Sequence, residues 1–365
     1  MITPEESAML SRFSSRKCAK SFSSIHLENP VEIRKSEIGG VCDEDPDRMR
    51  EAIENFGIPS DRVFTEVEAC LTSVKPDIAI LCPATALHAD YTERVAPFGV
   101  HILMEKPFAS TLEEADRMIA AMEGSGKHLM VNWPLRWVAG HVTAKRLLDE
   151  GRIGELKEVH YYDGNRGPLW HGADKIEMEP TVERKQASWF YKREAGGGSL
   201  QDYLGYGTTL GTWYHGGKAP TEVCAMTQGT SGLEVDEHSV TLAKYAHGLS
   251  KFETRWGTFT DPWTHQPLPK CGYVLTGTEG TIASFDYEPT IRVQTRENPA
   301  GEDVPVDSLP PEGANPIAYL VDCLEKGKAP EGPLNPTVAR IGQQIVDTAA
   351  ESARLGRTLP LKERS

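Results

Sequence analysis

The 365-residue chain has 39% hydrophobic and 25% charged residues, as is typical of a folded globular protein, and its length predicts two domains. Its net charge of −14 argues against a nucleic-acid partner, because phosphate binding requires a basic face. No apolar run approaches the roughly 18 residues that a membrane span requires.

The first residues and the cysteines indicate where the protein works. Residues 1–22 are rich in Ser, Lys and Arg but contain no apolar stretch, so we do not expect a signal peptide. The seven cysteines form no CxxC pair, which favours reduced thiols over disulfides or zinc. We therefore expect a cytoplasmic protein.

The first third alternates strand-like and helical segments. The expected strands are 37–42, 63–64, 77–82, 101–104 and 128–132. The expected helices are 45–56, 66–73, 88–96 and 110–123, the last with a capping box from Ser110 to Glu113 and an end at Gly124. This alternation predicts a Rossmann-like, doubly wound parallel sheet over residues 1–132.

The pattern changes after a predicted helix at 139–150. Strand-like segments follow at 156–162, 222–228, 239–243, 249–256, 272–276 and 291–293. Two amphipathic helices, 315–326 and 336–354, close the chain. We expect residues 133–365 to form an α+β domain with a large, mostly antiparallel sheet that binds substrate.

The tripeptide Glu105-Lys106-Pro107 follows directly after the predicted strand at 101–104. Ligands of open α/β sheets bind beyond the carboxyl ends of the strands, so the Lys106 ammonium could donate to a substrate oxygen there. The alternative is a surface lysine after an edge strand.

A second candidate is the segment from Gly196 to Tyr206, which begins with three glycines and continues as a helix. Asp202 and Tyr206 are four residues apart and therefore share one helix face. A carboxylate beside a phenol can orient a substrate and move a proton. The alternative is a flexible loop followed by a helix whose tyrosine packs in the core.

These elements together resemble the Gfo/Idh/MocA oxidoreductases over about nine-tenths of the chain. The resemblance rests on the Glu-Lys-Pro element and on Gly-Gly-Gly-x-Leu-x-Asp-x-x-x-Tyr, supported by the segments 83–88, 189–198 and 277–282. It implies that Lys106 contacts the reacting hydroxyl and that Asp202 orients the substrate. Tyr206 takes the place of the usual catalytic histidine, as in the glucose–fructose oxidoreductase branch. We expect the Lys106 ammonium to lower the Tyr206 pKa.

The sequence departs from the family where the dinucleotide-binding glycine turn is expected. Residues 1–38 contain no glycine, although such a turn lets the pyrophosphate approach the backbone. A wrong start or an upstream frame error, a genuine variant that binds the cofactor through other contacts, and loss of cofactor binding all remain open.

The resemblance also implies a set of binding residues. Asp43 would accept hydrogen bonds from the ribose and favour NAD over NADP, although it could instead be a helix N-terminal charge. The other expected cofactor-binding residues are Pro83, Leu87, His88, Glu105, Lys106, Pro107 and Asn132. The expected substrate-binding residues are Arg136, Arg166, Trp170 and Trp189, although Arg136 could instead be a surface residue and Trp170 could only anchor its own loop. The histidine spacing predicts no metal site.

The sequence thus predicts an NAD(P)-dependent oxidoreductase that moves a hydride between the nicotinamide and a hydroxyl or keto carbon of a sugar or polyol. Two alternatives stay open: a ligand-sensing or regulatory protein of the same fold, and an NAD-assisted glycoside-cleaving enzyme. By resemblance we expect a homodimer or homotetramer, with neither nucleic acid nor membrane as a partner.

Overall fold

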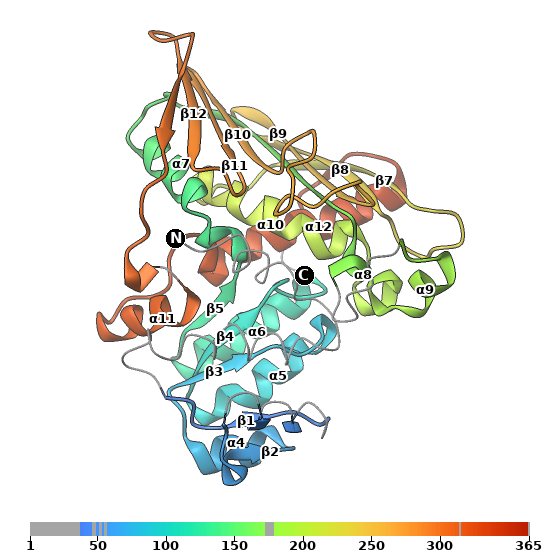
Figure 1. Cartoon of the computed structure of the whole chain (residues 1–365), viewed down its shortest axis with the longest axis vertical. Coiled ribbons are helices and arrows are strands. Elements are labelled where there is room, and N and C mark those ends of the chain that lie inside the picture. Colours follow the sequence, from blue (N-terminus) through green and yellow to red (C-terminus); the bar gives the residue numbers. More distant parts are fainter. Residues whose placement is uncertain are drawn as a thin grey trace.

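The computed structural model describes residues 37–45, 49–50, 53–54, 57–171, 179–313 and 315–363. Parallel strands with flanking helices lie at one end of the molecule and a large sheet at the other, with α10 (Ser199–Tyr214) and α12 (Pro336–Leu355) between them (Figure 1). The predicted combination of a Rossmann-like sheet with an α+β part is confirmed. The expected helix at 45–56 lies partly outside the described residues, as does all of 1–36.

The parallel strands form two small sheets among the described residues. β1 (Val41–Cys42) pairs with β2 (Val63–Phe64), while β3 (Ile78–Leu81), β4 (His101–Glu105) and β5 (Leu129–Asn132) form the second sheet in that order. The strand expected at 37–42 is shorter than predicted, because only its last two residues pair with β2. In the second sheet Glu105 lies opposite Asn132, which places both at the carboxyl ends of their strands.

Helices follow these strands as predicted, with small shifts at their ends. They are α4 (Val67–Val74), α5 (His88–Val95) and α6 (Leu112–Ser125). The N-cap of α6 is Thr111 rather than Ser110, because the Thr111 hydroxyl accepts the Glu114 amide at 3.2 Å. The helix continues past Gly124 and ends before Gly126, whose φ of 66° terminates it.

Among the described residues, the large sheet has nine strands in the order β13-β12-β11-β10-β6-β9-β8-β7-β14. Its pairs are antiparallel except β6 with β9, so the prediction of a mostly antiparallel sheet is confirmed. The strands are β6 (Leu156–Asn165), β7 (Glu222–Gln228), β8 (His238–Tyr245), β9 (Gly248–Trp256), β10 (Gly272–Gly277), β11 (Gly280–Phe285), β12 (Thr290–Thr295), β13 (Glu302–Pro305) and β14 (Leu359–Pro360). β6 runs three residues further than expected because Asp163, Gly164 and Asn165 also pair with β9.

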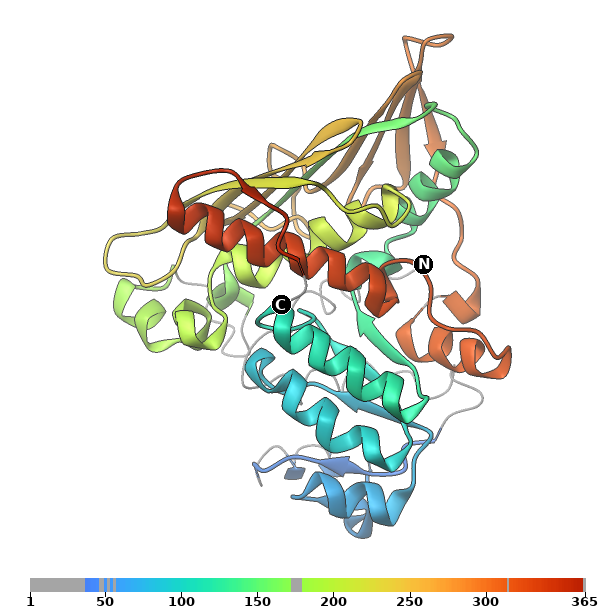
Figure 2. The same ribbon diagram turned by 180° about the vertical axis from the view of Figure 1, so that it is seen from behind.

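The remaining helices cover or connect these sheets. They are α7 (Ala139–Asp149), α8 (Pro168–His171), α9 (Val182–Ala187) and α11 (Pro316–Glu325). Short 3-10 turns lie at Ser60–Arg62, Thr85–Leu87, Ala96–Phe98, Pro134–Trp137, Trp189–Tyr191, Arg193–Ala195, Pro311–Gly313 and Gly332–Leu334. Seen from behind, α12 crosses between the large sheet and α6 (Figure 2).

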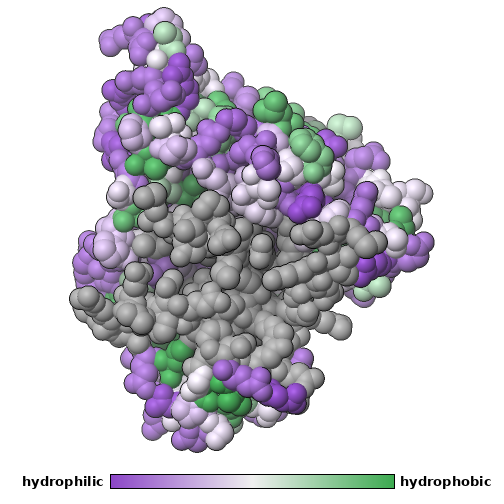
Figure 3. Space-filling model, in the orientation of Figure 1, coloured by the Kyte–Doolittle hydropathy of each residue, from purple (hydrophilic) through white to green (hydrophobic). Residues whose placement is uncertain are grey.

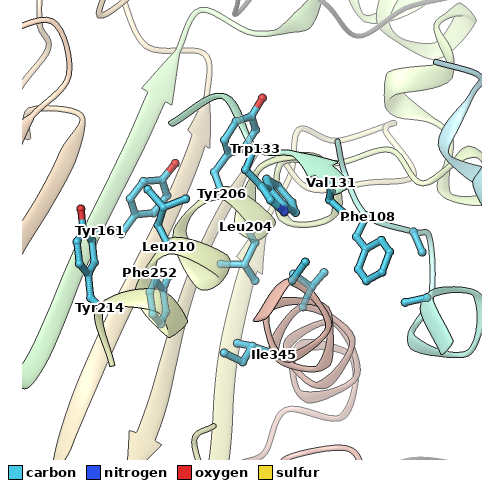
Figure 4. Packing of buried hydrophobic residues seen from close by; sticks show 14 of the residues in the cluster. Phe108, Val131, Trp133, Tyr161, Leu204, Tyr206, Leu210, Tyr214, Phe252 and Ile345 are labelled. Atoms are coloured by element: carbon cyan, nitrogen blue, oxygen red, sulfur yellow. The ribbon is translucent and has the colours of Figure 1, made fainter. Parts of the chain in front are cut away.

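Buried hydrophobic residues of α10 pack on the inner face of the large sheet (Figure 4). Glycines permit this close approach: a Cβ at Gly207 would lie 2.3 Å from Tyr161 Cδ1, and one at Gly211 would lie 2.7 Å from Phe252 Cε1. Because α10 is held so close to the sheet, its first turns are fixed relative to β6 and β9.

The outer face of the large sheet is solvent-exposed. Figure 3 shows hydrophobic patches among hydrophilic residues over the part of the molecule where this sheet lies. Met226, Leu242 and Leu249 are among its exposed apolar side chains. Within the described residues, no helix combines the length and apolar character needed to cross a membrane.

Candidate active site

The centre of the candidate site is an ion pair between the two parts of the fold. Lys106 follows β4, Asp202 lies in the first turn of α10, and Lys106 Nζ is 3.0 Å from Asp202 Oδ1. The Lys106 and Asp202 side chains are only 6% and 4% exposed. The structure therefore brings together two residues that are 96 positions apart in the sequence.

Two tyrosines of α10 complete the surroundings of Lys106. The Nζ atom lies 5.0 Å from the centre of the Tyr206 ring and 5.4 Å from that of Tyr203. Tyr206 also meets the Trp133 ring edge-on, with 5.6 Å between ring centres. Figure 4 shows the Tyr206 hydroxyl pointing away from the packed core around Leu204. Lys106, Asp202 and Tyr206 thus form one cluster.

The charges in this cluster set which groups hold protons. Burial disfavours the Lys106 ammonium, but Asp202 and Tyr203 outweigh this effect and raise the Lys106 pKa above its ordinary value. Burial also raises the Tyr206 pKa well above its ordinary value, and Asp202 and Asp163 act in the same direction. The expectation that Lys106 lowers the Tyr206 pKa is therefore wrong, because burial and two nearby acids dominate. Both Lys106 and Tyr206 are protonated at neutral pH.

Glu105 is held in place behind the ion pair. Its Oε1 accepts a hydrogen bond from Asn132 Nδ2 at 2.6 Å, and Asn132 Oδ1 accepts one from Trp137 Nε1 at 3.0 Å. Burial raises the Glu105 pKa to about 7, although the bond from Asn132 opposes the shift. These two hydrogen bonds fix the ends of β4 and β5, and therefore the backbone from which Lys106 extends.

Several buried polar atoms near the ion pair have no hydrogen-bond partner among the described residues. Asp202 Oδ2 is the most informative, because the residue is 3% exposed and only its Oδ1 bonds Lys106. Leaving a buried acceptor without a donor costs free energy, which a bound hydroxyl would recover. The Trp133 indole nitrogen is likewise buried and without a partner.

Leu87 and His88, two of the residues predicted to bind the nicotinamide, follow the carboxyl end of β3. Leu87 is 43% exposed, whereas His88 is buried with Nδ1 3.1 Å from the Phe108 carbonyl oxygen. Burial lowers the His88 pKa to about 4, so the neutral ring braces the segments after β3 and β4. Direct contact of His88, Pro83 or Pro107 with a cofactor stays a prediction.

Asp43 directly follows β1, as expected for a ribose-binding acid. Its Oδ1 accepts the Asp45 backbone N–H at 2.9 Å, and its own N–H donates to the Phe64 carbonyl at 3.2 Å. The first bond is an Asx turn, so the local structural role and the ribose-binding role both stay open. The glycine-free stretch discussed above lies outside the described residues except for its last two positions.

The expected substrate-binding residues lie in different surroundings. The Arg136 guanidinium is 5.5–5.7 Å from the ring centres of Trp137, Trp213 and Tyr319. These rings are not the ones that surround Lys106, which are Tyr203 and Tyr206. The contact of Arg136 with substrate is therefore a prediction that the observed neighbours do not favour. Burial lowers the Arg136 pKa.

Arg166 and Trp170 form a stacked pair beyond the end of β6. Arg166 Nε donates to Asp261 Oδ2 at 2.6 Å, and the guanidinium carbon lies 4.5 Å from the Trp170 ring centre. Trp189 stacks on Phe190 with 4.0 Å between ring centres. The apolar cluster around Phe190 also includes Tyr203, so Trp189 is linked to the Lys106 cluster by packing.

Sequence reasoning missed two residues near the ion pair. Tyr203 gave no signal beyond its position on the helix that carries Asp202. Asp163 falls just after the predicted end of its strand, yet its charge acts on Tyr203 and Tyr206. Period-two alternation with Tyr161, continued for one more step, would have placed it on the same inner face.

A second polar cluster contains serine, histidine and aspartate, but its arrangement is structural. His141 Nδ1 is 2.9 Å from Ser284 Oγ, and His141 Nε2 is 2.8 Å from Asp286 Oδ1. All three residues are buried, with Ser284 and His141 fully enclosed. No group of three or more His, Cys, Asp or Glu side chains in the described ranges could hold a metal ion.

Comparisons with known proteins agree with this architecture. Residues 19–133 match the oxidoreductase family with an NAD-binding Rossmann fold, and residues 141–283 match the GFO/IDH/MocA C-terminal domain. D-apiose dehydrogenase from Paraburkholderia graminis is 25% identical over 356 residues, which cover 93% of this chain and 87% of that protein.

Solved structures show the same fold along nearly the whole chain. Aldose-aldose oxidoreductase from Caulobacter crescentus, complexed with glycerol, superposes with a TM-score of 0.76 at 20% identity, covering 95% of this chain and 97% of that one. Levoglucosan dehydrogenase, in complex with NADH and levoglucosan, gives 0.73 at 17% identity and covers 98% and 96%. The chain belongs to the Gfo/Idh/MocA family of oxidoreductases.

Proposed function

We propose that this protein is an NAD(P)-dependent oxidoreductase acting on a hydroxyl or keto carbon of a sugar or polyol. The observation that carries the proposal is the buried Lys106–Asp202 pair beside Tyr206, with Asp202 Oδ2 lacking a partner among the described residues. The matched relative is named for dehydrogenation of a sugar, and the similar structures contain glycerol or levoglucosan. Both observations favour a ligand rich in hydroxyl groups.

The roles of the three residues follow from their protonation states. Lys106, as an ammonium, donates a hydrogen bond to the reacting oxygen, and Asp202 Oδ2 accepts one from a substrate hydroxyl. Tyr206, as a neutral phenol, would give a proton to that oxygen when a carbonyl is reduced. When bound, the nicotinamide supplies or accepts the hydride at the substrate carbon.

The cofactor would extend from the carboxyl end of β3 and β4 toward β1. Pro83, Leu87 and Glu105 would hold the nicotinamide side, and Asp43 would accept the ribose hydroxyls. An acid at that position repels a 2′-phosphate, so we propose that NAD is preferred to NADP. Calorimetric titration with each dinucleotide tests this preference directly, and tighter binding of NADP would contradict it.

The Tyr206→Phe variant tests the catalytic proposal. We expect turnover of sugars, followed by nicotinamide absorbance, to fall about 10²- to 10⁴-fold, the usual contribution of a positioned proton donor. Tyr214→Phe is the matched control: it removes a hydroxyl from the same helix, one that donates to the His141 carbonyl at 3.2 Å. Full activity of Tyr206→Phe would exclude Tyr206 from proton transfer.

A non-catalytic, ligand-sensing role is the second candidate. The observation that favours it is the absence of glycine from residues 1–38. Tight binding of NAD and of a sugar in calorimetry, without any change in nicotinamide absorbance across a sugar and polyol panel, would support sensing over catalysis. Release of nitrophenol from a nitrophenyl glycoside would instead indicate the NAD-assisted glycoside-cleaving alternative.

We further propose that two domains, residues 1–132 and 133–365, act in a cytoplasmic homodimer or homotetramer. The alternate, outward residues of β7, β8 and β9 include the exposed Met226, Leu242 and Leu249, which form an apolar surface suited to self-association. Light scattering coupled to gel filtration tests this, with Leu242→Lys expected to produce monomers.

A further inference from the structure

We propose that Asp163 is a specificity-determining residue, which binds a second hydroxyl group of the substrate and selects neutral sugars or polyols over anionic ones. This inference rests on the proposed function, because it assumes that the reacting oxygen lies at Lys106 and Asp202. The argument begins with where β6 places Asp163.

The register between α10 and β6 brings Asp163 to the ion pair. A Cβ at Gly211 would lie 3.8 Å from Val159, and one at Gly207 would lie 2.3 Å from Tyr161. Each step of two residues along the strand, about 6.6 Å, thus matches a step of four residues back along the helix, about 6 Å. The next step pairs Asp163 with the turn that contains Asp202 and Tyr203.

Electrostatic effects agree with this placement. The charges of Lys106 and Asp202 both act on the Asp163 carboxyl group, and its own charge acts on Tyr203 and Tyr206. Asp163 therefore faces the same residues as the proposed reacting oxygen, but it approaches them from the sheet rather than from α10.

The Asp163 carboxyl group retains capacity to bind a ligand. Tyr161 Oη donates to its Oδ2 at 3.0 Å, and this is the side-chain hydrogen bond that the described residues provide. The residue is partly exposed, unlike Asp202. Its second oxygen can accept from a substrate hydroxyl, or donate when protonated. Together with the unpartnered Asp202 Oδ2, the site offers two carboxyl groups to one polyhydroxylated ring.

The charge balance around these groups disfavours an anion. Lys106 is already paired with Asp202, and burial raises the pKa of the nearby Glu105 and Asp163 to about 7, so that these two carboxyl groups are partly ionised at neutral pH. An added carboxylate or phosphate on the substrate would face Asp202 and the ionised fraction of Glu105 and Asp163 in a partly desolvated site, and such like-charge contacts weaken binding. A hydroxyl group in the same place has no such cost.

The experiment compares a neutral hexose with the corresponding hexuronate, using turnover and calorimetric binding in the presence of the dinucleotide. Wild-type protein should bind and turn over the neutral sugar at least about a hundredfold better. Asp163→Ala should raise KM for the neutral sugar about tenfold or more with a smaller change in kcat, because a substrate hydrogen bond is lost. The Asp163→Asn variant removes the negative charge but keeps a side chain that can form hydrogen bonds. It should therefore reduce the preference for the neutral sugar over the hexuronate about tenfold.

The matched control is Asp322→Asn, which removes a carboxylate on α11 that pairs with Lys326 at 2.8 Å. Asp322→Asn should leave KM and the binding constant for the neutral sugar unchanged. If Asp163→Ala does not fold, Asp163→Asn carries the test. A preference for the hexuronate, or an unchanged KM and binding constant in both Asp163 variants, overturns the proposal. Binding that depends on Asp163 without any turnover would refute the proposed enzyme while supporting this inference, and binding of no neutral sugar would overturn both.

Discussion

The Lys106–Asp202 pair provides a quantitative test, because the stability and the activity that depend on it can be separated. At 3.0 Å and an effective dielectric constant of about 20, the attraction between the two charges is about 5 kcal/mol. In Asp202→Asn the ammonium remains buried without its partner, so unfolding free energy should fall by about 3–5 kcal/mol. Deprotonation of Lys106 limits this loss, since moving an ordinary lysine pKa to neutrality costs about 5 kcal/mol.

The double variant Lys106→Met/Asp202→Asn removes both charges and should recover at least about half of that stability. Neither variant should turn over substrate, because the reacting oxygen loses its contacts. Urea unfolding followed by tryptophan fluorescence and circular dichroism measures stability, with Asp303→Asn as a control. The Arg292–Asp303 pair is exposed, so its loss should cost less than about 1 kcal/mol. A double variant no more stable than Asp202→Asn, or a loss below about 1 kcal/mol in Asp202→Asn, would refute the reasoning.

Other substitutions test packing, titration and cofactor choice. Gly207→Ala should destabilise by about 1–3 kcal/mol in urea unfolding, because its Cβ would meet the Tyr161 ring at 2.3 Å, whereas Gly124→Ala, with nothing within 4 Å, should stabilise by about 0.5–1 kcal/mol. The folded-state His88 pKa is depressed from 6.5 to about 4, so its contribution to stability is present above pH 6.5 and is lost as pH falls. From about pH 7.5 to about pH 5 wild-type protein should therefore lose about 2 kcal/mol relative to His88→Gln, and a pH-independent difference would contradict this. Asp43→Ser should shift the NAD/NADP ratio of kcat/KM about tenfold toward NADP, roughly 1.4 kcal/mol, and an unchanged ratio would remove Asp43 from ribose recognition.

Local rules predict where Lys106 lies and which helix face Asp202 and Tyr206 share, whereas the convergence of the three residues was implied by the resemblance to the Gfo/Idh/MocA oxidoreductases. Lys106 comes after a strand, and the carboxyl end of a parallel strand borders the site. The spacing of four between Asp202 and Tyr206 fixes their common helix face. Neither conclusion requires knowledge of what lies opposite.

The protonation state of Tyr206 could not be predicted in the same way. It depends on burial beside Trp133 and on the charges of Asp202 and of Asp163, which lies on β6, far from Tyr206 in the sequence. Asp163 itself was missed because aspartate is uncommon in strands and resembles a loop residue, whereas pairing with Thr254 of β9 keeps it in the sheet. The protonation state of Tyr206 and the strand conformation of Asp163 both depend on tertiary contacts, not on local sequence preference.

The buried Ser284–His141–Asp286 arrangement has a consequence for how such triads are interpreted. In serine hydrolases the ring nitrogen nearest the acid is Nδ1 and the one nearest the serine is Nε2, whereas here the two are exchanged. With Ser284 fully enclosed, its oxygen has no route to an ester or peptide. The hydrogen bonds of the three side chains instead hold α7 against β11, although these elements are more than 140 residues apart in the sequence. The cluster therefore stabilises the packing of α7 on the sheet and does not act as a nucleophile.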